Sequence, residues 1–242
     1  MTNAVELFET PSGLLIFDYT PNLTIVGTTH AVSPDIKRDL DEIISESDFV
    51  AVEYDDLRRR KRGVAQYTLW FHTSGYNPET HRLYVNLLDA VFLELLCAAN
   101  GIRIRIENHR LMLDQGELEF QSEFLYCIEK AEAMGKNAYM VDMPIFETLG
   151  MLVQMPMKTK FETVLTHARG KPLPEAAGTI IETRREQYML DRIEECEGPL
   201  SELQRKGVLI VGLSHAENYA KRMKSCGQEK ITPQSTAQHL PT

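Results

Sequence analysis

Two histidines, at positions 30 and 215, end two similar stretches that lie near opposite ends of the chain. Residues 23–30 read LTIVGTTH and residues 208–215 read VLIVGLSH, so each stretch is a short apolar run followed by Gly-x-x-His. The apolar runs are typical of buried strands, and we expect the glycines to turn the chain sharply through backbone angles that other residues avoid. His30 and His215 would then follow the carboxyl ends of two strands, where open α/β sheets bind ligands. The pair predicts one shared functional site.

Carboxylates follow other predicted strands. Glu53 ends the apolar segment 49–53, where an unpaired buried carboxylate would be costly, so it either lies at the mouth of a site or is solvated. Asp142 ends another predicted strand and could be a site residue or a turn residue. Glu107 or His109 follows a third strand. Titratable groups are therefore expected to gather along one edge of the sheet.

These residues favour hydrolysis by activated water. Two histidines and a carboxylate are a usual ligand set for a divalent metal that keeps a position for water, so His30, Glu53 and His215 could hold Mn, Co or Zn. The same residues could also work without metal, with one histidine as general base held in the right tautomer by a carboxylate such as Glu53. The sequence contains no nucleophile elbow, Walker loop or dinucleotide fingerprint, and His215 makes Ser214 a poor nucleophile.

The elements that position these residues alternate between strand-like and helix-like segments. This alternation predicts an α/β fold, with a central mixed β-sheet flanked by helices and a helical insertion in the middle of the chain. The expected strands cover residues 14–19, 23–26, 49–53, 102–106, 138–141 and a last segment that begins at Gly207. The expected helices cover residues 34–47, 78–100, 117–134 and 175–196. Ser33 is placed to cap the first helix, and residues 144–174 predict short helices or a mobile cover.

The composition of the chain limits the kinds of partner that it is expected to bind. Lys and Arg total 26 against 35 Asp and Glu, and the net charge of −9 argues against nucleic acid as a main partner. The basic run 58–62 is either a solvated loop or a source of an arginine, such as Arg58, for an anionic substrate or an acidic catalytic residue. The apolar helix at 83–99 could supply either a core or an interface between copies in a homo-oligomer.

The chain is expected to be cytoplasmic and without a membrane span. Four cysteines are far apart in the sequence and are expected to be reduced structural thiols. Neither a secretory signal nor an apolar run of 18 residues is visible. We expect one α/β domain over residues 1–227, followed by a polar, flexible tail over residues 228–242.

Several motifs carry a resemblance to a known family. They are VGTTH at 26–30, VE at 52–53 with an arginine shortly after, EF at 123–124, YMVDMPI at 139–145, REQYM at 185–189 and VGLSH at 211–215. Over residues 23–223, these motifs resemble the TraB/PrgY/GumN family, which is related to the Tiki proteases and, more distantly, to erythromycin esterases and ChaN-like proteins. The chain departs from the family pattern at Gln121 and Met143, and we expect it to be without the membrane-spanning tail of many TraB proteins.

The resemblance implies a hydrolase-like cleft. The core residues of that cleft would be His30, Glu53, Arg185 and His215. The residues that support them would be Arg58, Glu123 and Asp142. Tiki members are described as metal-dependent proteases, TraB and PrgY members as suppressors of peptide pheromone activity, and erythromycin esterases as metal-independent hydrolases. Arg185 could stabilise negative charge on a tetrahedral intermediate or hold a peptide carboxylate, or it could be a solvated arginine.

Three hypotheses follow for the function. The first is a metal-dependent, peptidase-like hydrolase that acts on a peptide or small-molecule substrate. The second is a non-catalytic protein that sequesters a peptide or small ligand, in the manner of pheromone shutdown. The third is a metal-free, esterase-like hydrolase with His30 as the base.

Overall fold

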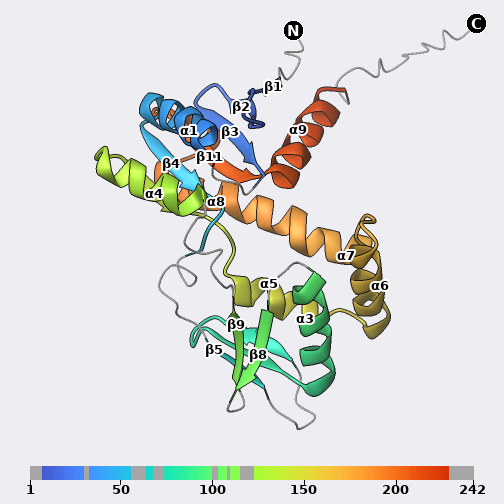
Figure 1. The fold of residues 1–242 in the computed structure, drawn as a ribbon. Coiled ribbons are helices and arrows are strands. Elements are labelled where there is room, and N and C mark those ends of the chain that lie inside the picture. The colour runs from blue at the N-terminus through green and yellow to red at the C-terminus, as the bar shows by residue number, and fades with distance from the viewer. Residues whose placement is uncertain are drawn as a thin grey trace, which may run out of the picture.

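The computed structural model describes residues 7–29, 33–55, 64–67, 74–99, 103–107, 110–114 and 123–228. These residues form an α/β fold with a mixed six-stranded sheet flanked by helices, as the sequence predicts. A second sheet of five strands lies beyond it, and helices connect the two (Figure 1). We refer to them as the large sheet and the small sheet.

The large sheet has its four parallel strands side by side. Its strands, in spatial order, are β1 (Phe8–Glu9), β2 (Leu15–Thr20), β3 (Leu23–Thr28), β11 (Gly207–Gly212), β4 (Phe49–Val52) and β10 (Asn137–Met140). β3, β11, β4 and β10 run parallel to one another, while β2 runs antiparallel to both of its neighbours, β1 and β3. Gly212 at the end of β11 pairs with Thr28 at the end of β3, so these strands end at the same edge.

Helices cover both faces of the large sheet. α1 (Pro34–Glu46) and α4 (Glu123–Ala133) pack on one face, and α8 (Arg185–Glu197) and α9 (Leu213–Gln228) pack on the other. The sequence of β11 is continuously apolar because its alternate residues point into the two cores on opposite faces of the large sheet. Its Val208 and Ile210 belong to the core with α1 and α4, while its Leu209 and Val211 belong to the core with α8 and α9.

Local signals at two helices act as the sequence predicts. Ser33 caps α1, because its Oγ accepts a hydrogen bond from the backbone N–H of Ile36 at 3.2 Å, and Pro34 occupies the first position. Within the described residues, the expected helix at 117–134 is confirmed as α4 from Glu123 to Ala133, while its expected start at 117–122 lies outside the described residues. Gly135 has φ of +70°, a conformation that glycine adopts readily.

The small sheet lies in the middle of the chain, where a helical insertion was expected. Its strands, in spatial order, are β6 (Gly75–Asn77), β7 (Arg82–Val85), β5 (Val64–Tyr67), β9 (Arg110–Asp114) and β8 (Arg103–Glu107). The accompanying helices are α3 (Leu87–Ala99), α5 (Ile145–Val153) and α6 (Met157–Ala168). The inserted segment is therefore part helix and part sheet.

The expected helix at 78–100 is wrong in its first part. Residues 82–85 form β7, and the helix begins at Leu87. Pairing with β5 and β6 overrides the local preference, because Leu83 and Val85 alternate into the core while His81 turns the chain with a positive φ.

The helix that leads to Arg185 is interrupted by a π-helical segment. α7 (Glu175–Gly178) continues into η2 (Thr179–Arg184), a π-helix, and then into α8. Figure 1 shows this run passing from the region of α6 to the large sheet. A single-turn 3₁₀ helix, η3 (Leu200–Glu202), follows α8. The expected tail at 228–242 lies outside the described residues except for Gln228, which ends α9.

In the part of the chain that the structure describes, no helix has both the length and the apolar character needed to cross a bilayer. Cys127 is buried and Cys196 is exposed, and both are free thiols.

Candidate functional site

The carboxyl ends of the four parallel strands bring polar side chains to one edge of the large sheet. In the spatial order of the strands, Thr28 ends β3, His215 follows β11, Glu53 follows β4, and Asp142 follows β10. The ladder continues past β4, because the backbone N–H of Glu53 donates to the carbonyl of Ile210 at 2.9 Å. The sheet edge expected from the sequence therefore exists, although it does not include Glu107, which lies on the small sheet.

Gly27 and Gly212 do not turn the chain through backbone angles that other residues avoid. Among the described glycines, those with positive φ are Gly13, Gly135, Gly170 and Gly198, and the expectation for Gly27 and Gly212 is therefore wrong.

The strand β11 passes directly into α9, so His215 lies in the first turn of that helix. Gly27 lies inside β3 and gives room for the same helix. A Cβ atom on Gly27 would lie 2.6 Å from the Cβ of Ala216, closer than two carbons can approach. Gly27 therefore lets α9 pack close to β3, and this packing sets the position of His215.

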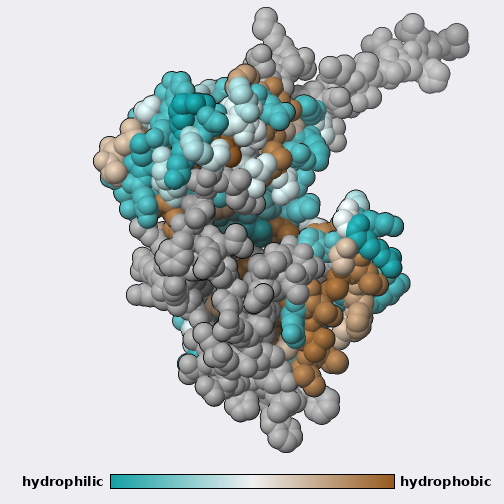
Figure 2. Space-filling model, viewed as in Figure 1, coloured by the Kyte–Doolittle hydropathy of each residue, from teal (hydrophilic) through white to brown (hydrophobic). Residues whose placement is uncertain are grey.

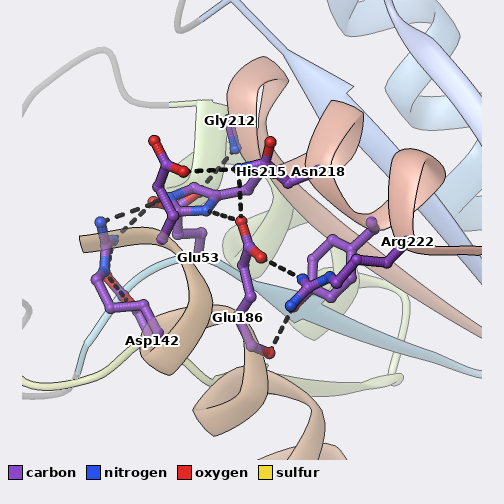
Figure 3. Close-up of polar contacts among 10 residues, drawn as sticks. Glu53, Asp142, Glu186, Gly212, His215, Asn218 and Arg222 are labelled. Carbon is purple, nitrogen blue, oxygen red and sulfur yellow. Dashed lines mark hydrogen bonds and ion pairs between the residues drawn. The ribbon is translucent and has the colours of Figure 1, made fainter. Parts of the chain in front are cut away.

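Arg185 binds two carboxylates at the start of α8. Its Nε donates to Oδ1 of Asp142 at 3.0 Å, and its Nη2 donates to Oδ2 of Asp142 and to Oε1 of Glu53, both at 2.7 Å (Figure 3). Its side chain is 14% exposed, so the interpretation of a solvated arginine is wrong. Burial alone lowers the pKa of Arg185, but the two carboxylates outweigh it and raise the pKa, so the guanidinium stays charged.

Glu53 ties three elements together at the sheet edge. Its Oε2 accepts the backbone N–H of Gly212 at 2.7 Å, while its Oε1 accepts from Arg185. The same Oε1 lies 3.4 Å from Nε2 of His215. This buried carboxylate therefore joins the ends of β4 and β11 to the start of α8. Its hydrogen bonds and its ion pair with Arg185 offset the free-energy cost of burying it.

Glu186 holds the other nitrogen of His215. Its Oε1 lies 2.9 Å from Nδ1 of His215 and accepts from Nδ2 of Asn218 at 3.1 Å, while its Oε2 pairs with Arg222 (Figure 3). The backbone carbonyl of Glu186 also accepts from the hydroxyl of Tyr219 at 2.6 Å. All four partners lie on α9, so Glu186 links α8 to one face of that helix.

The pKa values of this pair shift in opposite directions. Burial alone lowers the pKa of His215, but the charge of Glu53 and the hydrogen bond to Glu186 outweigh it, and the pKa is raised. Burial raises the pKa of Glu186, but hydrogen bonds from His215 and Asn218 and the charge of Arg222 outweigh it, and that pKa is lowered. An ionised carboxylate only accepts hydrogen bonds, so Nδ1 of His215 carries a proton.

Glu186 is a residue of this cluster that was not expected from the sequence motifs. The signal that could have indicated it is the polar face of α9, where His215, Asn218 and Arg222 follow a spacing of three and four residues. Such a face on a helix that also packs against a sheet requires a polar partner. Glu186, which follows Arg185 in the sequence, is that polar partner.

Glu123, expected as a supporting residue, lies beside the end of β3. Its Oε1 accepts from the hydroxyl of Thr28 at 2.6 Å, and both side chains are buried. Glu123 is the first residue of α4, where the helix dipole favours a negative charge. The structure therefore places Glu123 next to the strand that leads to residue 30.

Three residues named from the sequence, His30, Arg58 and His109, lie outside the described residues. Within the described ranges, no three His, Cys, Asp or Glu side chains are placed to share a metal ion. The two described members of the expected ligand set, Glu53 and His215, both face the guanidinium of Arg185, at 2.7 Å from Oε1 and 3.5 Å from Nε2. A second cation would compete with that guanidinium, so these two of the three expected ligands do not fit a metal while Arg185 stays in place.

Comparison of the chain with protein-family models, with curated proteins and with solved structures finds no match. The resemblance to the TraB/PrgY/GumN family thus remains an expectation from sequence motifs.

The arrangement has the parts of a histidine-based acid–base site. One imidazole nitrogen is held by a carboxylate, and the other faces a second carboxylate and an arginine. A carboxylate in the first position orients the ring and stabilises its protonated form, as in catalytic triads. A guanidinium in the second position can stabilise an anion that forms beside the ring.

Proposed function

We propose that this protein is a hydrolase in which His215 activates water, Glu186 orients His215, and Arg185 stabilises negative charge. The observation that carries the proposal is the 2.9 Å contact between Nδ1 of His215 and Oε1 of Glu186, which leaves Nε2 facing Glu53 and Arg185. This chemistry suits a peptide bond or an ester in a peptide or small-molecule substrate.

In the proposed reaction, Nδ1–H of His215 donates to Glu186 while Nε2 takes a proton from water. The resulting hydroxide forms a bond to the carbonyl carbon of the substrate, and the carbonyl oxygen becomes an anion. Arg185 stabilises this anion through Nη1, which lies 3.5 Å from Nε2 of His215. The protonated ring then gives its proton to the leaving amine or alcohol as the bond from carbon to that group breaks.

The metal-dependent form of the hypothesis places Mn, Co or Zn at His30, Glu53 and His215. Arg185 would then have to withdraw from Glu53, which breaks a buried ion pair. We therefore favour the metal-free form of the hypothesis. We assign the role of general base to His215, whereas the hypothesis from the sequence assigned it to His30. In this form, the guanidinium supplies the positive charge that a metal would otherwise provide.

The test is a hydrolysis assay on the full chain with a panel of p-nitrophenyl esters and a mixture of short peptides. We expect turnover that survives strong chelation and falls by about 10²-fold or more in His215→Ala, because a positioned acid–base group contributes about that much. His167→Ala on α6 is the matched control and should keep full activity.

Each other outcome assigns a different function. Activity that chelation abolishes and Mn, Co or Zn restores would support the metal-dependent hydrolase instead. Stoichiometric retention of a peptide without turnover would support a sequestering protein. Equal activity in the wild type and His215→Ala, with both folded, would remove His215 from the chemistry.

A further inference from the structure

Exposed large apolar side chains gather on two helices of the small-sheet region. Of the ten such side chains among the described residues, seven lie on α3 and α6. They are Leu87, Leu88, Val91 and Leu95 on α3, and Met157, Phe161 and Leu165 on α6. Figure 2 shows the apolar surface over these two helices, which pack against each other. We refer to these seven residues as the α3–α6 face.

The spacing of the residues makes this face continuous. On α6, Met157, Phe161 and Leu165 follow one another at intervals of four, and so they lie in a row on one side of the helix. The opposite side of α3 is also apolar, because Leu93 and Leu96 are buried in the core of the small-sheet region. A helix that is apolar all round is typical of a buried helix. Apart from the buried Asp89 and the exposed Glu94, α3 is apolar on both sides, and among the described residues its outer side is an exposed apolar surface.

We propose that the α3–α6 face is the interface of a symmetric dimer of this chain. The exposed fractions of its seven side chains correspond to roughly 600 Å² of apolar surface, at or above the largest patch that monomers usually leave in water. In a two-fold dimer the same face serves both copies. The total then reaches about 1,200 Å², which is the lower bound of a stable protein interface.

The charges around the face favour a second copy of the chain over a membrane. Exposed Glu94 on α3 and exposed Lys158 and Glu162 on α6 lie at its edge, and Nζ of Lys158 lies 3.8 Å from Oε1 of Glu162. A face that carries both signs can place opposite charges against each other when it meets its own copy across a two-fold axis. Membrane-surface helices instead carry an excess of Lys and Arg, and this chain has a net charge of −9.

The test is sedimentation velocity on the full chain over a range of concentrations, with a matched pair of variants. Phe161 is 59% exposed and Phe8, on the edge strand β1 of the large sheet, is 60% exposed, so replacing either with Asp makes the same change at a site of equal exposure. We expect a dimeric wild type, a dimer dissociation constant at least about 100-fold higher in Phe161→Asp, and no change in Phe8→Asp. Leu165→Asp should act like Phe161→Asp, since each residue occurs twice in the interface.

Circular dichroism and thermal unfolding establish that each variant is folded. A wild type that stays monomeric at 100 μM would overturn the proposal. A Phe161→Asp variant and a Leu165→Asp variant that both dimerise like the wild type would also overturn it, because the dimer would then use another surface. Flotation of a monomeric wild type with anionic lipid vesicles, lost in Phe161→Asp, would assign the face to membranes instead.

Discussion

Glu186 and His215 form a buried contact in which Oε1 of the carboxylate lies 2.9 Å from Nδ1 of the imidazole. The contact joins the start of α8 to the first turn of α9, which pack on the same face of the large sheet. Because Nδ1 is engaged, Nε2 is the nitrogen that faces Glu53 and Arg185. This asymmetry between the two nitrogens is what a directional acid–base role requires.

Replacing Glu186 with Gln tests that role directly. Glu186→Gln keeps the shape of the side chain but removes its charge, so the pKa of His215 should fall, and kcat/KM for any hydrolysed substrate should drop on the order of 10²-fold. NMR titration of the His215 ring measures the pKa. Glu182→Gln, one turn earlier and 3.3 Å from Asn218, is the matched control. An unchanged His215 titration in Glu186→Gln would contradict the assigned contact.

The raised pKa of His215 predicts how stability depends on pH. The folded state binds this proton more tightly than the unfolded chain, so the stabilisation is complete below the ordinary histidine pKa of about 6.5. It disappears as pH rises through the raised pKa of the folded state. The free energy of unfolding of the wild type relative to His215→Gln should therefore be larger at pH 6 than at pH 9, as measured by urea unfolding at each pH. A difference that grew with pH would show that the shift has the opposite sign.

Arg185 should be the most costly side chain of the cluster to remove. Arg185→Met leaves Glu53 and Asp142 buried without their cation, and we expect a loss of about 3–5 kcal/mol in the free energy of unfolding. Adding Asp142→Asn should recover part of that loss, because one of the two buried carboxylates that Arg185 bound is then neutral. Arg192→Met on the same helix is the control, because its salt bridge is exposed and its loss should cost less than about 1 kcal/mol. Equal costs at both arginines in denaturant unfolding would refute the buried network.

Gly27 should not tolerate a side chain. Gly27→Ala places a Cβ 2.6 Å from that of Ala216, and we expect a loss of about 1–3 kcal/mol from overpacking. Adding Ala216→Gly should recover part of the stability, less about 1 kcal/mol for a glycine in a helix. Gly178→Ala is the control, since nothing lies within 4 Å of its new Cβ and alanine is the better helix former, so it should be neutral or stabilising. Thermal unfolding of the wild type and these three variants decides whether close packing of α9 on β3 explains the need for glycine at position 27.

The large sheet could be predicted because its signals are local. The apolar run before Glu53 forms β4 as expected, and the capping signal at Ser33 starts α1. The small sheet could not be predicted in the same way. Its strand β7 is four residues long and depends on pairing with β5 and β6, so the neighbouring helical pattern obscured it.

The sequence by itself determined that polar residues would follow buried parallel strands, and so that Glu53, Asp142 and His215 would gather at one edge of a sheet. The reason is that continuous apolar runs must be buried on both faces, and parallel strands end at a common edge. Only the tertiary structure decided that Arg185 binds two of these carboxylates and that Glu186 holds His215. Those contacts depend on how α8 and α9 are rotated and positioned on the sheet. That rotation is set by packing between residues far apart in the chain, which no local pattern records.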